Sequence, residues 1–375
     1  MIRMNDFAAE PAELRAAMQA AAARVFASGW YVLGPECEAF DRAWAQACGA
    51  QRSVGVGNGL DAIELALRAL DIGAGDEVIT TGMTAVATVL GIIRAGAVPV
   101  LADIDPQTAL LDPASVERCI SPRTKAVLLV HLYGQVRQMD AWQALCRRHG
   151  IELVEDCAQA HLAQWDGRVA GRFGAAGAYS FYPTKNLGAI GDGGAVVTDR
   201  IELADRVARL RNYGQSERYV HPELGMNSRL DELQAALLSV RLQWLESFTQ
   251  RRREIAARYD AQISHPAVRK LAPAQQPLAH VHHLYVLCCD DRKAFMAQLA
   301  DRGVQSLIHY PIPANAQQPL APLRIDPAGL PATQRHADAC VSLPCHPQMS
   351  EAEVDAVIAG VNGFRGGAAA RGGVR

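Results

Sequence analysis

Lys185 is a candidate for a reactive amine. Lys185 follows an apolar run that ends near Ser180, and glycines are frequent just after it, in residues 188–194. A lysine at the end of a buried strand is partly desolvated, which lowers the pKa of its amine and makes it a nucleophile for a carbonyl group. Glycines would let a bulky group approach the backbone closely. The alternative for Lys185 alone is a solvated surface lysine.

A carboxylate stands at the end of another apolar run. Asp156 closes the run that begins at residue 152, and Gln159 comes three residues later. A carboxylate at the carboxyl end of a strand is the partner that a pyridinium nitrogen needs, and the amide of Gln159 could meet a phenolic oxygen. The alternative for Asp156 is a cap on a following helix, a position that aspartate favours.

A glycine-rich loop completes the set. Residues 55–61 read GVGNGLD between an apolar run and a helical pattern, and backbone N–H groups at a helix start bind phosphate. The loop lacks the GxGxxG fingerprint of dinucleotide binding, and Asp61 fits a helix cap better. Taken in chain order, the phosphate loop, Asp156, and Ser180 with Lys185 indicate pyridoxal 5′-phosphate much better than any one of them does.

Between Ser53 and Thr198, the elements that must position these residues follow one repeating pattern. Short apolar runs alternate with helical patterns, which predicts a doubly wound α/β domain with a mostly parallel sheet. Functional groups in such a sheet collect at the carboxyl ends of the strands. The predicted strands are 53–56, 77–80, 98–104, 126–132, 152–156, 176–181 and 195–198, and the predicted helices are 61–70, 84–95, 113–120 and 140–149.

The rest of the chain predicts a smaller unit. Residues 231–263 lack Gly and Pro and predict one long helix that leads out of the large domain. Strands at 283–289 and 304–308 and helices at 292–301 and 351–361 follow, with a long loop at 311–331. We therefore expect a large cofactor-binding α/β domain over residues 1–250, a small α+β domain over 251–362 and a disordered tail over 363–375.

Composition and charge exclude several classes of protein. Of the 375 residues, 37 are Lys or Arg and 39 are Asp or Glu, so no overall positive field attracts nucleic acid or a membrane surface. The longest apolar stretches fall short of the roughly 20 residues that span a bilayer. Nine scattered cysteines without a CxxC pair indicate reduced thiols, and the start of the chain does not resemble a signal peptide. We expect a cytoplasmic protein.

Several stretches resemble the DegT/DnrJ/StrS-type sugar aminotransferases, relatives of aspartate aminotransferase, from Trp30 to about Val361. The resemblance implies a fold-type-I pyridoxal phosphate-dependent transferase, with a mostly parallel seven-stranded sheet in the large domain and a smaller C-terminal α+β domain. The matching stretches are 29–34 (GWYVLG), 58–62 (NGLDA), 155–161 (EDCAQAH), 182–187 (YPTKNL) and 227–236 (NSRLDELQAA).

The resemblance also implies roles for single residues. Lys185 would be the catalytic residue, which holds the cofactor covalently and, once freed, moves a proton. Asp156 would keep the pyridine nitrogen protonated, and Gln159 would lie near the ring hydroxyl. In this family an asparagine matching Asn227 reaches the phosphate from the other subunit, which implies a homodimer with composite active sites. The expected cofactor-binding residues are Asn58, Gly59, Leu60, Asp156, Gln159, Ser180, Lys185 and Asn227.

Within the family the chain is most similar to enzymes that aminate C3 of dTDP-3-oxo-6-deoxyhexoses. This similarity rests on 185–194 (KNLGAIGDGG), 211–214 (RNYG), 219–221 (YVH) and 306–311 (SLIHYP). The implied reaction moves an amino group from L-glutamate to the keto nucleotide sugar and gives a dTDP-3-amino-3,6-dideoxyhexose. Arg, Tyr and His side chains suit its phosphates and base. The expected substrate-binding residues are Tyr31, Tyr182, Arg211, Tyr213, Tyr219, Arg229, His309 and Tyr310.

Three alternatives stay open at this point. The acceptor could be a 4-keto sugar or a UDP sugar. The family resemblance also covers sugar dehydratases, but these have histidine where Lys185 stands, so lysine favours transamination. A non-catalytic, cofactor-binding regulatory protein is the third alternative, and the intact set of Asp156, Gln159, Ser180 and Lys185 argues against it.

Ala85 departs from the family pattern. It lies in residues 83–88 (MTAVAT), where the family usually has an aromatic ring that stacks on the cofactor. The missing ring should loosen cofactor binding, or another side chain must fill the gap.

The histidine cluster at 280–283 (HVHH) invites a metal interpretation. It has no nearby cysteine or carboxylate at ligand spacing. We therefore expect a strand that begins at His283, and no metal site.

Overall fold

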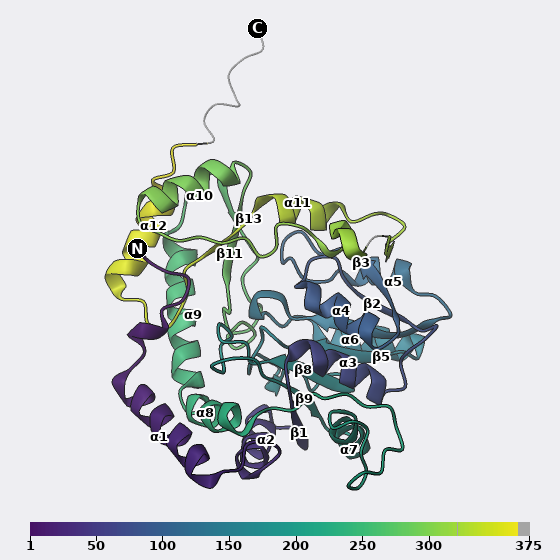
Figure 1. The fold of residues 1–375 in the computed structure, drawn as a ribbon. Helices are drawn as coiled ribbons and strands as arrows, with labels where there is room; N and C mark the ends of the chain where they lie inside the picture. Colours follow the sequence, from purple (N-terminus) through teal and green to yellow (C-terminus); the bar gives the residue numbers. More distant parts are fainter. Residues whose placement is uncertain (321, 367–375) are drawn as a thin grey trace.

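The main sheet brings parallel strand ends to one edge. The computed structural model describes residues 1–320 and 322–366, and its main sheet has eight strands in the order β1-β9-β8-β5-β4-β2-β3-β12 (Figure 1). β9 is antiparallel to β1 and β8, whereas the other neighbours are parallel. The strands are β1 Arg52–Val56, β2 Glu77–Thr81, β3 Val98–Ala102, β4 Thr124–Val130, β5 Glu152–Asp156, β8 Ala176–Ser180, β9 Gly194–Thr198 and β12 Arg324–Ile325.

The predicted α/β class with a mostly parallel sheet is confirmed, and its seven strands are all present. The eighth strand, β12, comes from the segment 311–331 that we predicted as a loop. β12 pairs with Val100 and Leu101 of β3 over only two residues, which is too short for a periodic sequence signal.

Helices cover both faces of this sheet. Leu128 faces the helices α3 and α7, whereas its neighbour Leu129 packs in the cluster that contains residues of α2, α5 and α6. Because successive side chains of a strand point to opposite faces, a doubly covered strand reads as a continuous apolar run. One face carries α3 Gly59–Ala69, α4 Val86–Arg94 and α7 Ile201–Leu210, and the other carries α2 Pro35–Cys48, α5 Pro113–Cys119, α6 Met139–His149 and α8 Glu232–Leu242.

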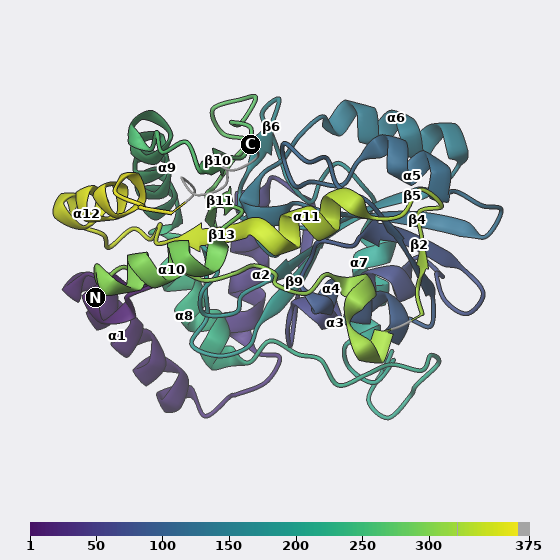
Figure 2. The same ribbon diagram turned by 90° about the horizontal axis from the view of Figure 1, so that it is seen from above.

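A smaller sheet lies beside the large one. β11 Tyr285–Cys289 pairs antiparallel with β10 Val268–Lys270 and with β13 Cys340–Leu343. Seen from above, α9, α10 and α12 lie on the side away from the large sheet (Figure 2). The segment 304–308 forms isolated bridges to Ile2 and Ser342 in place of the predicted strand. The helices are α9 Leu245–Gln262, α10 Arg292–Asp301 and α12 Glu351–Asn362.

The single long helix predicted over 231–263 is two helices, α8 and α9. The chain turns at Gln243 and Trp244, where the Trp244 N–H donates to the Arg241 carbonyl at 3.0 Å. No Gly or Pro marks this turn, so the sequence gives no signal for it. The predicted domain boundary at residue 250 lies inside α9, and it stays a prediction.

The predicted disordered tail begins too early. Phe364 is buried, and its ring lies 5.2 Å from that of Phe295 between centroids. The rest of the predicted tail, residues 367–375, lies outside the described residues. None of the helices over 1–320 and 322–366 combines the length and apolar character needed to cross a membrane. The remaining elements are η1 Phe7–Ala9, α1 Ala12–Ser28, η2 Leu132–Gly134, β6 Gln164–Trp165, β7 Arg168–Val169, η3 Ala314–Ala316, η4 Gln318–Leu320 and α11 Pro331–Ala339.

Candidate active site

Lys185 lies in a tight turn directly after β8. Its backbone N–H donates to the Tyr182 carbonyl at 2.8 Å. Gly188 makes the turn possible, because a Cβ there would collide with the Pro183 carbonyl. Burial lowers the pKa of the Lys185 amine to about 8, although the negative charge of Asp156 acts in the opposite direction. Near neutral pH, a usable share of this amine is therefore uncharged and nucleophilic.

Asp156 is the last residue of β5, and its carboxylate is held from two sides. The Ala158 N–H donates to Oδ1 at 3.1 Å, and the Thr88 hydroxyl donates to Oδ2 at 2.8 Å. No helix follows β5, since the next element is the short strand β6. The helix-cap alternative for Asp156 is therefore wrong, and the buried carboxylate is free to serve a cationic partner.

The start of α3 and the end of β8 form a site suited to an anion. Asn58 caps α3, with its Oδ1 accepting from the Asp61 N–H at 2.9 Å. A Cβ on Gly59 would lie 2.5 Å from the Ser180 Cβ, so only glycine lets the helix start lie against the serine. The first-turn N–H groups, including that of Leu60, and the Ser180 hydroxyl then offer donors to a phosphate.

Gln159 has a fixed orientation. Its Oε1 accepts from the Tyr133 N–H at 2.6 Å, and its Nε2 donates to the Tyr310 hydroxyl at 3.2 Å. Burial raises the pKa of Tyr310 to about 12, so this phenol keeps its proton. Tyr133 has a left-handed φ of 62°, an uncommon conformation for a non-glycine residue, and its hydroxyl donates to the His309 carbonyl at 2.5 Å.

These side chains fit pyridoxal phosphate. The amine of Lys185 suits its aldehyde, the carboxylate of Asp156 suits its ring nitrogen, and the α3 start with Ser180 suits its phosphate. The close approach of Gly59 to Ser180 is the feature that tests the fit, because a side chain there would close the anion site. The donor set on this sheet edge therefore matches the three ends of the cofactor.

A second predicted group lies on the loops after α7. The Arg229 guanidinium donates to Asn212 Oδ1 at 2.9 Å and lies 5.3 Å from the ring centroid of Tyr213. Asn212 also pairs with the exposed Asn227 through an isolated backbone bridge. Tyr219 is 78% exposed. Among the described residues no hydrogen bond joins these side chains to Lys185, and their roles stay predictions.

The other predicted substrate residues differ in how available they are. Tyr31 and Tyr182 are exposed. Arg211 is bound within the protomer, because its guanidinium donates to the Gly55 carbonyl and lies 3.7 Å from Asp41. His309 shares a hydrogen bond of 2.8 Å with the Ser342 hydroxyl, and burial lowers its pKa to about 4. Substrate binding by Arg211 would require it to leave these partners.

A sequence model of the DegT/DnrJ/EryC1/StrS aminotransferase family matches residues 12–362. The chain belongs to this family. The erythromycin biosynthesis sensory transduction protein EryC1 of Saccharopolyspora erythraea is 46% identical over 356 residues, which cover 94% of this chain and 97% of EryC1. The dTDP-3-amino-3,6-dideoxy-alpha-D-galactopyranose transaminase of Aneurinibacillus thermoaerophilus is 46% identical over 347 residues, which cover 92% and 95%.

The structural comparison agrees with the sequence. The crystal structure of DesV from S. venezuelae superposes with a TM-score of 0.93 at 42% identity and covers 96% of this chain and 97% of DesV. Enzymes of this family depend on pyridoxal phosphate, and solved structures of similar fold hold it in the pyridoxal or pyridoxamine form. The predicted family, fold class and cofactor of the aminotransferase are confirmed.

Sequence reasoning missed two residues that hold the site of the aminotransferase together. Thr88 contacts Asp156 from the first turn of α4. His283 donates from Nδ1 to Asn186 Oδ1 at 3.2 Å, beside Lys185. Burial holds the pKa of His283 well below its usual range, so the ring is neutral. A hydroxyl at the start of a helix near the sheet edge was the only sequence signal for Thr88, and threonines at helix starts commonly bond only to the local backbone.

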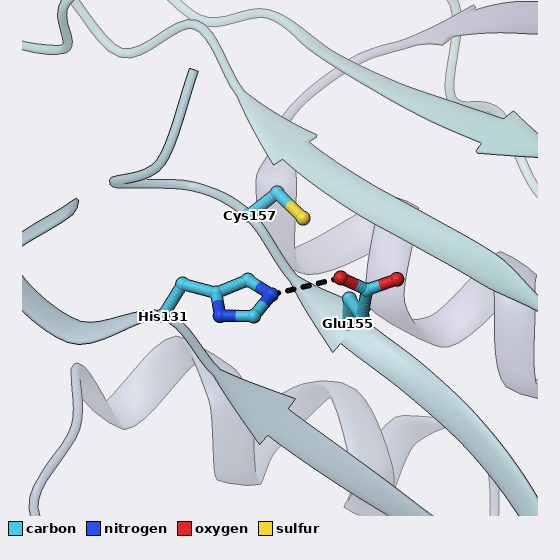
Figure 3. A group of neighbouring side chains, drawn as sticks. All are labelled: His131, Glu155 and Cys157. Carbon is cyan, nitrogen blue, oxygen red and sulfur yellow. Dashed lines mark hydrogen bonds and ion pairs between the residues drawn. The ribbon is translucent and has the colours of Figure 1, made fainter. Parts of the chain in front are cut away.

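The described part of the aminotransferase contains one compact group of possible metal ligands. His131, Glu155 and Cys157 place their ligand atoms within 4.8 Å of one another (Figure 3). The Glu155 carboxylate shares a bond of 2.8 Å with His131 Nε2 and also accepts from the backbone N–H groups of Gly171, Phe173 and Gly174. Because both oxygens already have partners, this group joins β4, β5 and the loop before β8 without a metal.

The pH dependence of cofactor uptake should reveal the lowered pKa of Lys185. Only the neutral amine attacks the aldehyde, so we expect the rate of pyridoxal phosphate binding to the apoenzyme to rise through about pH 8 and to level off above it. Stopped-flow absorbance measures this rate, with Lys185→Ala as the control that forms no covalent link. A rate that still climbs toward an ordinary lysine pKa of about 10.4 would contradict the assignment.

Gly59→Ala should weaken cofactor binding. The new Cβ, 2.5 Å from that of Ser180, must push the start of α3 away, and the loss of one hydrogen bond to the charged phosphate corresponds to at least about tenfold in Kd. Equilibrium dialysis with pyridoxamine phosphate measures the change. Gly73→Ala is the matched control, because its Cβ would meet nothing closer than 3.4 Å. Equal affinity of both variants would count against the phosphate site.

Ala85→Phe should slow the loss of pyridoxamine phosphate during dialysis with L-glutamate. Ala85 precedes α4 and is half-buried, and a stacked ring contributes about 0.5–1.5 kcal/mol, up to roughly tenfold in affinity. Val86→Phe adds the same ring at an exposed neighbouring position and serves as control. Unchanged or faster loss from a well-folded Ala85→Phe protein would mean that another side chain already covers the ring.

Proposed function

We propose that this aminotransferase transfers the amino group of L-glutamate to C3 of a dTDP-3-oxo-6-deoxyhexose and forms a dTDP-3-amino-3,6-dideoxyhexose. The observation that carries the proposal is the joint presence, at one sheet edge, of Lys185, Asp156, Gln159 and Ser180 in a chain 46% identical to a dTDP-3-amino-3,6-dideoxygalactose transaminase. A dTDP-3-amino-3,4,6-trideoxy-alpha-D-glucose transaminase of Streptomyces venezuelae, 44% identical over 356 residues, gives further support.

The side chains divide the chemistry between them. Bound pyridoxal phosphate supplies an electron sink that stabilises negative charge on the α-carbon of the amino donor. Lys185 Nζ would be the base that takes the proton from that carbon and delivers it to the carbon of the cofactor's aldehyde group, which its pKa of about 8 permits near neutral pH. Asp156 would hold the proton on the ring nitrogen. The start of α3 and Ser180 would hold the phosphate, and Gln159 would orient the ring through the ring's hydroxyl group.

We propose a homodimer whose active sites are shared between subunits. Large apolar and aromatic side chains are exposed on the protomer, including Trp30 at 57%, Tyr213 at 47% and Leu224 at 90%. A second chain that covered them would remove this apolar surface from water. Asn227 and Arg229 lie on the same loop region as Tyr213. If a second subunit covers this surface, the side chains of Asn227 and Arg229 would lie beside the active site of that second subunit.

We also place the reaction in the cytoplasm. All nine cysteines lie within the described residues, are buried and form no disulfide. Reduced thiols in this number fit a reducing compartment.

The relative EryC1 is named as a sensory transduction protein, which keeps a non-catalytic regulatory role as the second candidate. The intact set of Asp156, Gln159, Ser180 and Lys185 argues for catalysis, and so does the 46% identity to a curated transaminase.

Amino transfer can be tested in the reverse direction, which avoids the keto sugar. A dTDP-3-amino-3,6-dideoxyhexose is incubated with 2-oxoglutarate and the holoenzyme, and glutamate is measured by mass spectrometry. We expect glutamate from the wild type and none from Lys185→Ala. A UDP-3-amino sugar and a dTDP-4-amino sugar are compared in parallel. Faster turnover of either would contradict the proposed acceptor, and no turnover of any would favour the regulatory role.

The shared site predicts rescue between two damaged subunits. Lys185→Ala removes the base from one subunit's site, and Asn227→Ala removes the group that its partner would contribute. Mixed dimers should therefore contain one intact site out of two and regain about half of the wild-type activity. Tagged subunits allow the heterodimer to be purified and assayed. Inactive heterodimers that bind the cofactor would contradict the contribution of Asn227 across the interface.

A further inference from the structure

Two buried threonines extend from the start of α4 to Asp156. Thr84 and Thr88 are 4% and 1% exposed. Their hydroxyl oxygens are 2.7 Å apart, and Thr88 Oγ1 is 2.8 Å from Asp156 Oδ2. Neither threonine belongs to the residues assigned above to cofactor or substrate. The three groups form one continuous chain of hydrogen bonds that ends on the carboxylate.

Which group donates in each of these hydrogen bonds follows from the number of hydroxyl protons. An ionised carboxylate can only accept, so the single hydroxyl proton of Thr88 must point to Asp156. The Thr88 oxygen then has no proton left for Thr84, so Thr84 donates and Thr88 accepts. The polarity is Thr84 to Thr88 to Asp156. Hydrogen bonds that point the same way strengthen one another, and all of them favour negative charge on Asp156.

The geometry points to Thr88 as a positioning residue for the reaction. We propose that Thr88, supported by Thr84, fixes the plane of the Asp156 carboxylate and keeps its charge, so that the proton stays on the cofactor ring nitrogen. The inference rests on the proposed role of Asp156. The carboxylate receives one donor on Oδ1, the Ala158 N–H, and one on Oδ2. Since a carboxylate has about four acceptor positions, it can still receive the ring N–H.

Thr333, which lies outside this chain of hydrogen bonds, provides a matched control. Thr333 is fully buried, and its hydroxyl donates to Asp103 Oδ1 at 2.7 Å. Asp103 also accepts from the backbone N–H groups of Ala332 and Thr333. Thr333→Val therefore removes the same kind of bond, with the same change of shape, at a carboxylate that is not assigned to the site. Any effect that comes only from a lost buried hydrogen bond will appear in both variants.

The experiment follows the protonation of the ring nitrogen directly. Holoenzymes are loaded with pyridoxal phosphate labelled with ¹⁵N in the ring, and the nitrogen resonance is recorded by NMR together with kcat and KM. In Thr88→Val we expect the resonance to move toward that of an unprotonated ring and kcat to fall about 10- to 100-fold, the effect of losing one hydrogen bond to a charged group. KM for L-glutamate should stay within about threefold.

Conservative variants separate positioning from simple packing. Thr88→Ser keeps the donor and should restore the wild-type resonance, whereas Thr333→Val should change stability and leave the resonance in place. Thr84→Val keeps the bond to Asp156 and should give a shift in the same direction but smaller. If Thr88→Val folds poorly, Thr88→Ala and Thr84→Val report on the same carboxylate.

Asp156→Asn distinguishes failure of this inference from failure of the proposed site. A shifted resonance in Asp156→Asn together with a wild-type resonance in Thr88→Val and Thr88→Ala would overturn the threonine chain and leave the role of Asp156 intact. An unchanged resonance in Asp156→Asn would overturn the role of Asp156 and the inference with it. Equal shifts in Thr88→Val and Thr333→Val would also overturn the inference, because the effect would not be specific to Asp156.

Discussion

The active site depends on how closely the first turn of α3 packs against the end of β8. Gly59 lies against Ser180, and a Cβ on Gly194 would collide with the Asn58 backbone. Three strands, β1, β8 and β9, are therefore locked around one helix start. Because the neighbouring strand β5 pairs with β8 in fixed register, the position of Asp156 relative to this anion site follows from the backbone alone.

The same sheet edge also determines the electrostatics of the site. Burial takes water away from Lys185 and lowers the pKa of its amine, while backbone and hydroxyl donors support the charge of Asp156. Different neighbours within one small region thus favour the neutral form of the Lys185 amine and the charged form of the Asp156 carboxylate. Such an arrangement is typical of catalytic sites. Such an environment favours function over stability, since a desolvated amine gains nothing from folding.

The sequence predicts those parts of the fold that depend on local patterns. β5 has the bounds that its apolar run indicates, and α10 begins and ends at the predicted residues. The break between α8 and α9 could not be predicted, because Gln243 and Trp244 are compatible with a helix and only packing bends the chain there. Contacts across long separations were also hidden: Gln159 meets Tyr310 across 151 residues, and Thr88 meets Asp156 across 68. No periodicity encodes such pairs.

Residues 2–4 are hydrogen-bonded to residues 303–305, which lie far away in the sequence. Ile2 exchanges backbone hydrogen bonds with Gly303 and Gln305, and the Met4 N–H donates to the Gln305 side chain across 301 residues. Loop closure over this span is entropically expensive and cannot occur until the ribosome has passed residue 305. The bridge between Ile2 and Val304 therefore forms late in folding on the ribosome, whereas strands β2 to β5 can already pair on the nascent chain.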